Sequence, residues 1–195
     1  MSISRPIPAG LLTAGIASLA LGGALGAAAA GAGGAFKLES TAAAPNATLA
    51  SDQVFNGFGC SGKNISPPLT WSGAPQAAKS FALTMFDPDA PTGSGWWHWV
   101  VYNIPASVTE LAQGAGNSEG PLPAGAVQGR TDFGTTGYGG PCPPAGSKPH
   151  RYIFTVYALK TAKLDVPADA SAAMVGFMIG ANKLGSASFT ALYGR

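Results

Sequence analysis

Three short runs of apolar, aromatic and β-branched residues place the strongest constraint on the fold of this chain. They span residues 80–86 (SFALTMF), 97–104 (WHWVVYNI) and 151–159 (RYIFTVYAL), and Pro, Gly, Asp or Asn bounds each run. Runs of this length and composition are typical of β-strands. With 28 Gly and 16 Pro, turns must be frequent and long amphipathic helices few. The pattern predicts a mainly β fold, with a further short strand at residues 189–193.

Residues 168–184 are the one segment with helical spacing. Asp169 or Ser171 can cap its amino end, because both side chains accept hydrogen bonds from the first free backbone amides. Gly176 and Gly180 lie inside it and weaken it, so we expect this helix to be stable only when it is packed against the rest of the protein.

The first 35 residues are predicted to be a cleaved signal peptide. Arg5 precedes an Ala/Leu/Gly-rich run at residues 9–25, and several A-x-A cleavage options follow between Ala27 and Ala35. An uncleaved membrane anchor is the alternative, although the Gly and Ala content weakens it. We therefore expect one domain at residues 36–195, in the periplasm or secreted, with no stable membrane span after processing.

Composition excludes one class of partner. The chain of 195 residues is 46% apolar, which suits one domain with a substantial core, and only 10% of its residues are charged. The formal net charge of +2 is spread without basic clusters. A nucleic-acid-binding surface needs such clusters, so we do not expect a nucleic acid partner.

The two cysteines, Cys60 and Cys142, are expected to form a disulfide. An even cysteine count in an exported chain favours a bond, here closing a loop of roughly 80 residues. Two separate buried thiols are the alternative. If bonded, the cysteines would tie residues 57–68 to the Pro-rich loop near residue 142.

The chain has only two histidines, and each follows a loop shaped by Pro or Gly. His98 follows the stretch DPDAP at residues 87–91, and His150 follows GGPCPP at residues 139–144. Loops that lead into strands present polar groups at one end of a β scaffold. Asp87 directly follows the first strand, so its carboxylate can join the two imidazoles in one pocket.

Strand alternation predicts which neighbours share a face with each histidine. His150 and Tyr152 should line one wall together. His98 should share its side with Val100 and Tyr102, opposite Trp97 and Trp99.

Five motifs in order resemble the phosphatidylethanolamine-binding proteins, specifically the bacterial Raf kinase inhibitor-like branch of the YbhB/YbcL type. The resemblance covers residues 55–195. The motifs are GCSGKNISP at 59–67, DPDAP at 87–91, GWWHW at 95–99, GYGGP at 137–141 with HRY at 150–152, and YGR at 193–195.

The resemblance implies a β-sandwich with a few short peripheral helices and a small cavity at one end. This cavity would accept an anionic group such as phosphate, acetate or a phosphoryl head group. Cys142 stands where animal members have a small glycine, which narrows or reshapes the rim. The matching positions predict these ligand-binding residues: Asp87, Pro91, Trp96, His98, Tyr138, Cys142, Pro144, His150 and Tyr152.

The chemistry of these residues agrees with an anion pocket. Imidazole and tyrosine groups donate hydrogen bonds to oxyanions, and Gly139 and Gly140 can turn backbone amides inward. A carboxylate beside an imidazole favours the protonated, donating ring, so we expect anion binding to weaken as the pH rises through the histidine range. Two roles remain open for Arg151: a structural salt bridge or a contact with the ligand. We expect no cofactor and no metal.

Two other functional classes remain open. An enzyme would use His98, His150 and Asp87 as a metal centre or as acid/base groups for hydrolysis. The sequence contains no H-x-x-x-H, H-E-x-x-H or C-x-x-C motif, and we do not expect catalysis. A docking inhibitor of a kinase or serine protease is implied by the family resemblance, and export favours a periplasmic or extracellular protein as its partner.

Overall fold

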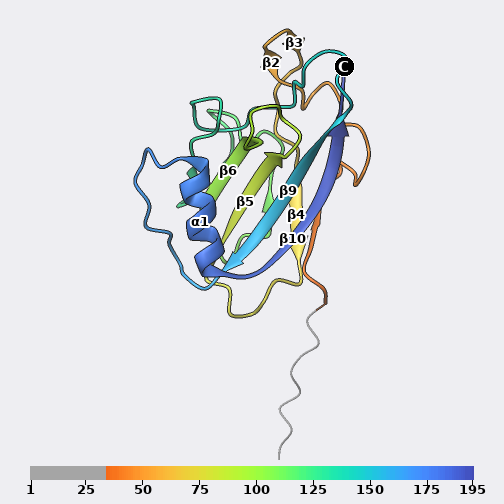
Figure 1. Ribbon diagram of the computed structural model, residues 1–195. Helices are drawn as coiled ribbons and strands as arrows, with labels where there is room; N and C mark the ends of the chain where they lie inside the picture. Colours follow the sequence, from red (N-terminus) through yellow and green to blue (C-terminus); the bar gives the residue numbers. More distant parts are fainter. Residues whose placement is uncertain (1–33) are drawn as a thin grey trace, which may run out of the picture. The chain divides into compact units, whose positions relative to one another are not determined.

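The computed structural model describes residues 34–195. The predicted signal peptide, residues 1–35, therefore lies almost wholly outside the described residues. Five strands form an antiparallel sheet in the order β10-β9-β5-β6-β8. Figure 1 shows β10, β9, β5 and β6 side by side in this order. Their bounds are Ser80–Asp87 (β5), Trp96–Pro105 (β6), Val127–Gln128 (β8), His150–Leu159 (β9) and Lys183–Tyr193 (β10).

A smaller antiparallel sheet has the order β1-β4-β7, and β2 and β3 pair as a separate hairpin. The bounds are Lys37–Glu39 (β1), Asn56–Gly57 (β2), Cys60–Ser61 (β3), Leu69–Ser72 (β4) and Glu110–Leu111 (β7).

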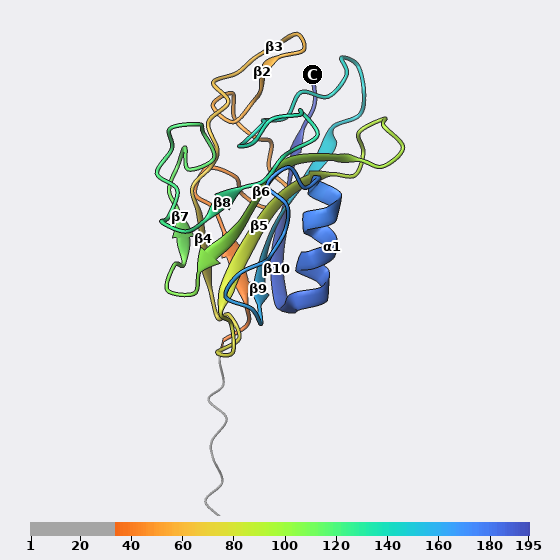
Figure 2. The same ribbon diagram turned by 90° about the vertical axis from the view of Figure 1, so that its left-hand side faces the viewer.

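The five-stranded sheet has a hydrophobic core on each face. On one face Trp99 and Phe154 pack with Trp71 of the small sheet in the larger core. On the other face the helix α1, Ala172–Asn182, inserts Val175 and Ile179 into a second core. Figure 2 shows the sheet seen from its edge, with α1 on one side and β4 and β7 on the other. The arrangement is two packed sheets with one helix on the outer face.

The predicted mainly β class is confirmed, and the three principal strands lie where the sequence places them. The last strand is longer than predicted, because it begins at Lys183 and pairs with β9 along its length. The helix is shorter than residues 168–184, and Ser171 is its cap: the Ser171 hydroxyl accepts from the Met174 amide at 3.2 Å. Within residues 34–195 it is the one α-helix, fewer than expected.

No helix among residues 34–195 combines the length and the apolar character needed to cross a bilayer.

Candidate functional site

Three strand ends meet at one edge of the large sheet. Because β5 runs antiparallel to both neighbours, its carboxyl end lies beside the amino ends of β6 and β9. Asp87 is directly paired with Trp96. The topology therefore brings Asp87, His98 and His150 together from three separate parts of the chain.

A pocket of about 170 Å³ opens between these strand ends and the surrounding loops. Its lining comprises Phe58, Asp87, Ala90, Pro91, Thr92, Trp96, His98, Phe133, Cys142, Pro143, Pro144, His150 and Tyr152.

Every predicted ligand-binding residue except Tyr138 lines this pocket. Tyr138 lies in the larger core, where its hydroxyl donates to the Gln53 carbonyl oxygen at 2.9 Å. It borders a neighbouring, more polar hollow instead. Phe58 and Phe133 line the pocket but were not predicted, because both lie outside the strands that the pattern identifies and nothing in their spacing marks them.

Asp87 is the centre of the polar groups in the pocket and is only 3% exposed. Its Oδ2 atom accepts from Nδ1 of His150 at 2.8 Å and lies 4.0 Å from Nε2 of His98. Its Oδ1 atom accepts from the Asp89 amide at 2.8 Å. Each carboxylate oxygen thus has one N–H partner and keeps capacity for a second donor.

A β-bulge in β6 positions His98. Met85 of β5 pairs with Trp99, yet the next residue, Phe86, pairs with Trp97. Two residues of β6 therefore oppose one step of β5, and His98 is the extra residue. A bulge of this kind reverses which face the following side chains point to.

The predicted face of His98 is wrong for this reason. Val100 and Tyr102 belong to the core under α1. The His98 ring instead packs edge-on against Tyr152, which belongs to the larger core, with the ring centroids 5.2 Å apart. Trp99 also belongs to that core. The predicted pairing of His150 with Tyr152 on one buried face is confirmed.

The His98 ring is fixed as a neutral tautomer. Its Nδ1 atom lies 2.7 Å from the Gly139 carbonyl oxygen, which can only accept, so Nδ1 carries the hydrogen. Burial lowers the pKa of His98 to about 4, against the opposing influence of the Gly139 carbonyl and Asp87. This lowered pKa disfavours the protonated form of the His98 ring at neutral pH.

Tyr152 supplies an unused donor. Its side chain is fully buried, and its hydroxyl has no hydrogen-bond partner. Burial is the main cause that raises the pKa of this hydroxyl, with a further contribution from the Asp87 charge. The group is a neutral O–H, and a buried hydroxyl without a partner is costly.

The amides of Gly139 and Gly140 do not face the pocket as donors. The Gly139 amide donates to the His98 carbonyl oxygen at 2.9 Å, and the Gly140 amide donates to Oδ1 of Asn64 at 2.7 Å. The expectation that they bind an anion is wrong. Gly140 is required for close packing instead, since a Cβ atom there would lie 2.0 Å from the Gln53 carbonyl oxygen.

Arg151 forms a salt bridge beside the pocket. Its guanidinium donates to both oxygens of Asp89, at 2.9 and 2.7 Å. The hydrogen bond from Arg151 is the main cause that lowers the pKa of Asp89 to about 2. Neither residue lines the pocket.

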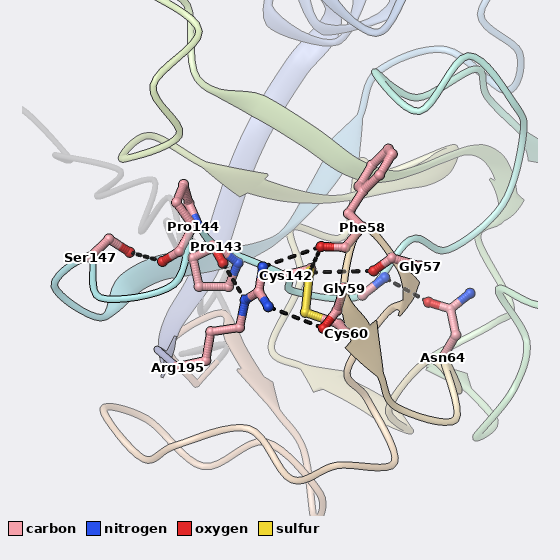
Figure 3. Close-up of a disulfide and its surroundings, with 11 residues drawn as sticks. Gly57, Phe58, Gly59, Cys60, Asn64, Cys142, Pro143, Pro144, Ser147 and Arg195 are labelled. Atoms are coloured by element: carbon pink, nitrogen blue, oxygen red, sulfur yellow. Dashed lines mark hydrogen bonds between the residues drawn. A yellow bond between two sulfur atoms is a disulfide. The ribbon is translucent and has the colours of Figure 1, made fainter.

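A disulfide joins Cys60 to Cys142 at the rim, with their Cα atoms 6.0 Å apart, as predicted. Figure 3 shows that this bond ties the β2–β3 hairpin to the Pro-rich loop. Arg195 spans the same two segments: it donates to the carbonyl oxygens of Pro143, Gly59 and Phe58. These contacts hold the Phe58 ring at the rim of the pocket.

Among residues 34–195, no group of three or more His, Cys, Asp or Glu side chains is arranged to hold a metal ion.

Comparison with known proteins identifies the family. A family model described as phosphatidylethanolamine-binding protein matches residues 39–194. The chain is 56% identical to the UPF0098 protein YbcL of Escherichia coli over 160 residues, 82% of this chain and 87% of YbcL. It is also 56% identical to the UPF0098 protein YbhB of the same organism over 140 residues, 72% of this chain and 88% of YbhB.

The solved structures agree with this assignment. The crystal structure of E. coli YbcL covers 82% of this chain and 98% of its own, with a TM-score of 0.80 and 55% identity. A homologue from Chlamydia trachomatis, CT736, has a TM-score of 0.68 and 31% identity, with 82% and 97% of the two chains covered. The chain therefore belongs to the phosphatidylethanolamine-binding protein family.

Proposed function

We propose that this protein is an exported receptor for a small anionic group, a phosphoryl or carboxylate head group. The observation that carries the proposal is the Tyr152 hydroxyl, which is buried without a partner beside Asp87, His98 and His150 in one pocket. Ligand pockets typically combine apolar walls with a few convergent polar groups. The proposed role is binding without catalysis, and it uses no cofactor.

The groups around the pocket allow an anion to bind despite the Asp87 charge. Tyr152 offers its hydroxyl hydrogen. His150 is oriented by its Nδ1 contact with Asp87, which leaves Nε2 as the second edge of that ring. Phe58, Phe133 and the prolines of the rim give the pocket apolar walls, and apolar surroundings strengthen a hydrogen bond to a charged ligand.

Calorimetry with a tyrosine variant tests the proposal. Titration with inorganic phosphate, O-phosphoethanolamine and acetate should give binding in the wild type. Tyr152→Phe should weaken it about 10- to 100-fold, the effect of losing one hydrogen bond to a charged group. The same variant should keep or raise the melting temperature of the free protein, because it removes an unsatisfied buried hydroxyl.

Tyr157→Phe is the matched control, since Tyr157 lies on the same strand but packs against the core under α1. It should leave the affinity unchanged. The absence of binding in the wild type, or equal affinity in Tyr152→Phe, would contradict the proposed role.

Export is the second part of the proposal. Disulfides persist in oxidising compartments, and the bond between Cys60 and Cys142 supports a periplasmic or secreted location. Mass spectrometry of the protein from a periplasmic fraction should show cleavage between residues 27 and 37 and no free thiol. An intact amino terminus with two free thiols would count against export.

A docking role is a second candidate, in which the protein inhibits a periplasmic or extracellular enzyme. Phe58 favours it, because this side chain is 71% exposed at the rim of the pocket. Phe177, 74% exposed on α1, provides a matched control. Pull-down of periplasmic proteins should be lost in Phe58→Ala and kept in Phe177→Ala. Equal capture by both variants would argue against docking at the rim.

A further inference from the structure

The outer face of α1 is apolar and exposed. None of the 11 residues of this helix is charged. Val175 and Ile179 pack against the large sheet, whereas Met174 and Phe177 point away from it and are 49% and 74% exposed. Leu184, just past the helix, is 40% exposed. A helix that is apolar on all sides is typical of a buried position, so a partner is expected to cover this outer face.

Four exposed lysines gather at the carboxyl end of α1: Lys79, Lys160, Lys163 and Lys183. The Lys79 amide donates to the Leu159 carbonyl oxygen at 2.8 Å, and the Lys160 amide donates to the Asn182 carbonyl oxygen at 2.9 Å. Lys183 pairs with Leu159, and Lys163 follows in the loop after β9. Figure 1 shows this end of α1 beside the end of β9 and the start of β10. We call these four lysines the basic end.

The charges of the basic end are free to meet an anionic partner. Within residues 34–195, none of the four lysines forms a salt bridge. Asp165 is the acidic residue nearest to them along the chain, so four positive charges stand against one negative charge. The lysines come from three separate segments, and only the fold brings them together.

Aromatic side chains border the outer face of α1. A hollow of about 400 Å³ between α1 and the large sheet is lined by Trp97 and Tyr157, with Lys183 also in its wall. Trp and Tyr favour the boundary between lipid and water, because each combines an apolar ring with a polar tip.

An apolar helix face beside a basic end is complementary to an anionic lipid surface. Such a surface offers phosphate charges at its boundary and hydrocarbon just beneath. Lysine stems can lie along apolar groups while their ammonium groups reach the phosphates. Met174 and Phe177 would then enter the head-group region, and the lysines would hold the charged surface.

We propose that the outer face of α1 and the basic end bind peripherally to membranes that contain anionic lipid. This inference goes beyond the proposed function, because the pocket lies at the opposite end of the large sheet. Asp87 is the last residue of β5, whereas Lys79 directly precedes its first residue. The pocket stays open to its ligand while the protein lies on the membrane.

Co-sedimentation with lipid vesicles tests the proposal, using protein purified from the periplasmic fraction. Vesicles of phosphatidylcholine with phosphatidylglycerol should bind the wild type, and pure phosphatidylcholine vesicles should bind it weakly. Each lysine near an anionic surface strengthens binding about fivefold, so Lys160→Gln combined with Lys183→Gln should weaken it about 25-fold. High salt should also release the wild type, because it screens exposed charges.

Lys63→Gln combined with Lys148→Gln is the matched control for charge. This double variant loses the same two charges, but Lys63 follows the β2–β3 hairpin and Lys148 precedes β9, both near the pocket. It should bind the vesicles as the wild type does. Equal loss in both double variants would overturn the proposal, since net charge alone would then explain binding.

Phe177→Gln tests the apolar face, and Phe58→Gln is its control because Phe58 is similarly exposed at the rim of the pocket. Losing one inserted phenylalanine ring should weaken vesicle binding at least about 10-fold in Phe177→Gln. Phe58→Gln should bind unchanged. The same affinity in Phe177→Gln and the wild type would overturn the role of α1.

Two further outcomes would overturn the proposal. Loss of vesicle binding in Tyr152→Phe would place the lipid in the pocket instead of on α1. Absence of vesicle binding, together with a dimer in analytical ultracentrifugation that Phe177→Gln dissociates, would show that a second copy of the chain covers α1. Vesicle binding that survives in Tyr152→Phe and is lost in the α1 and basic-end variants supports it.

Discussion

His98 should make the stability of this protein depend on pH in a defined window. Its folded pKa is about 4, against an unperturbed value of 6.5. The unfolded chain therefore takes up a proton at His98 as the pH falls below 6.5, while the native state does not until about pH 4. The contribution of His98 to stability is fully present above pH 6.5 and is lost as the pH falls to 4.

The magnitude follows from the size of the shift. One pKa unit corresponds to about 1.4 kcal/mol, so protonation of His98 should lower the free energy of unfolding by about 3 kcal/mol as the pH falls from 7 to 4. The ring is almost completely buried, at 4% exposed, so solvent screening does not reduce this figure much. Carboxylates also lose stabilising contacts in acid, and a variant is needed to isolate the histidine.

His98→Asn is suited to this purpose, because the asparagine amide can replace Nδ1 as the donor to Gly139. Urea unfolding followed by tryptophan fluorescence gives the free energy of each protein from pH 7 to pH 4. The wild type should lose about 3 kcal/mol more than the variant over this range. A constant difference between the two proteins would refute the reasoning.

NMR gives an independent check, because the chain contains only two histidines. Spectra of protein with labelled imidazoles should contain two ring signals, which His150→Asn assigns. The His98 signal should keep its neutral chemical shift from pH 8 to pH 5. A midpoint near 6.5 for His98 would show that burial does not control its protonation.

Two further predictions concern stability. Replacing both Cys60 and Cys142 with Ser should lower the unfolding free energy by about 4 kcal/mol, because the bond closes a separation of 82 residues. The same change should weaken phosphate binding, because it loosens the rim of the pocket. Equal urea midpoints for reduced and oxidised protein would contradict the predicted loss of stability. Gly140→Ala should destabilise the fold severely, because its Cβ would overlap backbone atoms, whereas Gly180→Ala has open space in α1 and should stabilise the protein by about 1 kcal/mol. Thermal unfolding of the two variants measures both effects. A similar effect of both substitutions would refute the packing argument.

Local patterns were sufficient to predict the main strands and the polar centre of the pocket. β5, β6 and β9 are short runs rich in apolar, aromatic and β-branched residues, and such runs indicate strands from the residues alone. Asp87, His98 and His150 lie next to strand ends, and antiparallel pairing brings those ends together. These polar groups were therefore predicted from their positions beside strands, whereas the family resemblance implied the other pocket residues.

The bulge at His98 was not predictable in this way. Alternation assumes that every residue pairs, but the register of β6 against β5 skips His98. Phe58 and Arg195 were also missed as parts of the rim, because each acts through contacts with residues far along the chain. Nothing in the local sequence marks Phe58 as a rim residue, and the YGR motif that contains Arg195 does not indicate which segments this side chain contacts.

The sequence by itself determined the strands and the order of polar groups along the chain, since each depends on neighbouring residues or on residue type. The tertiary structure alone decided what those groups do. The carbonyl of Gly139 and the surrounding aromatic rings make His98 a neutral acceptor, and Asn64 takes up the Gly140 amide. Protonation and hydrogen-bond roles depend on burial and on partners distant in sequence, and only the folded chain brings these together.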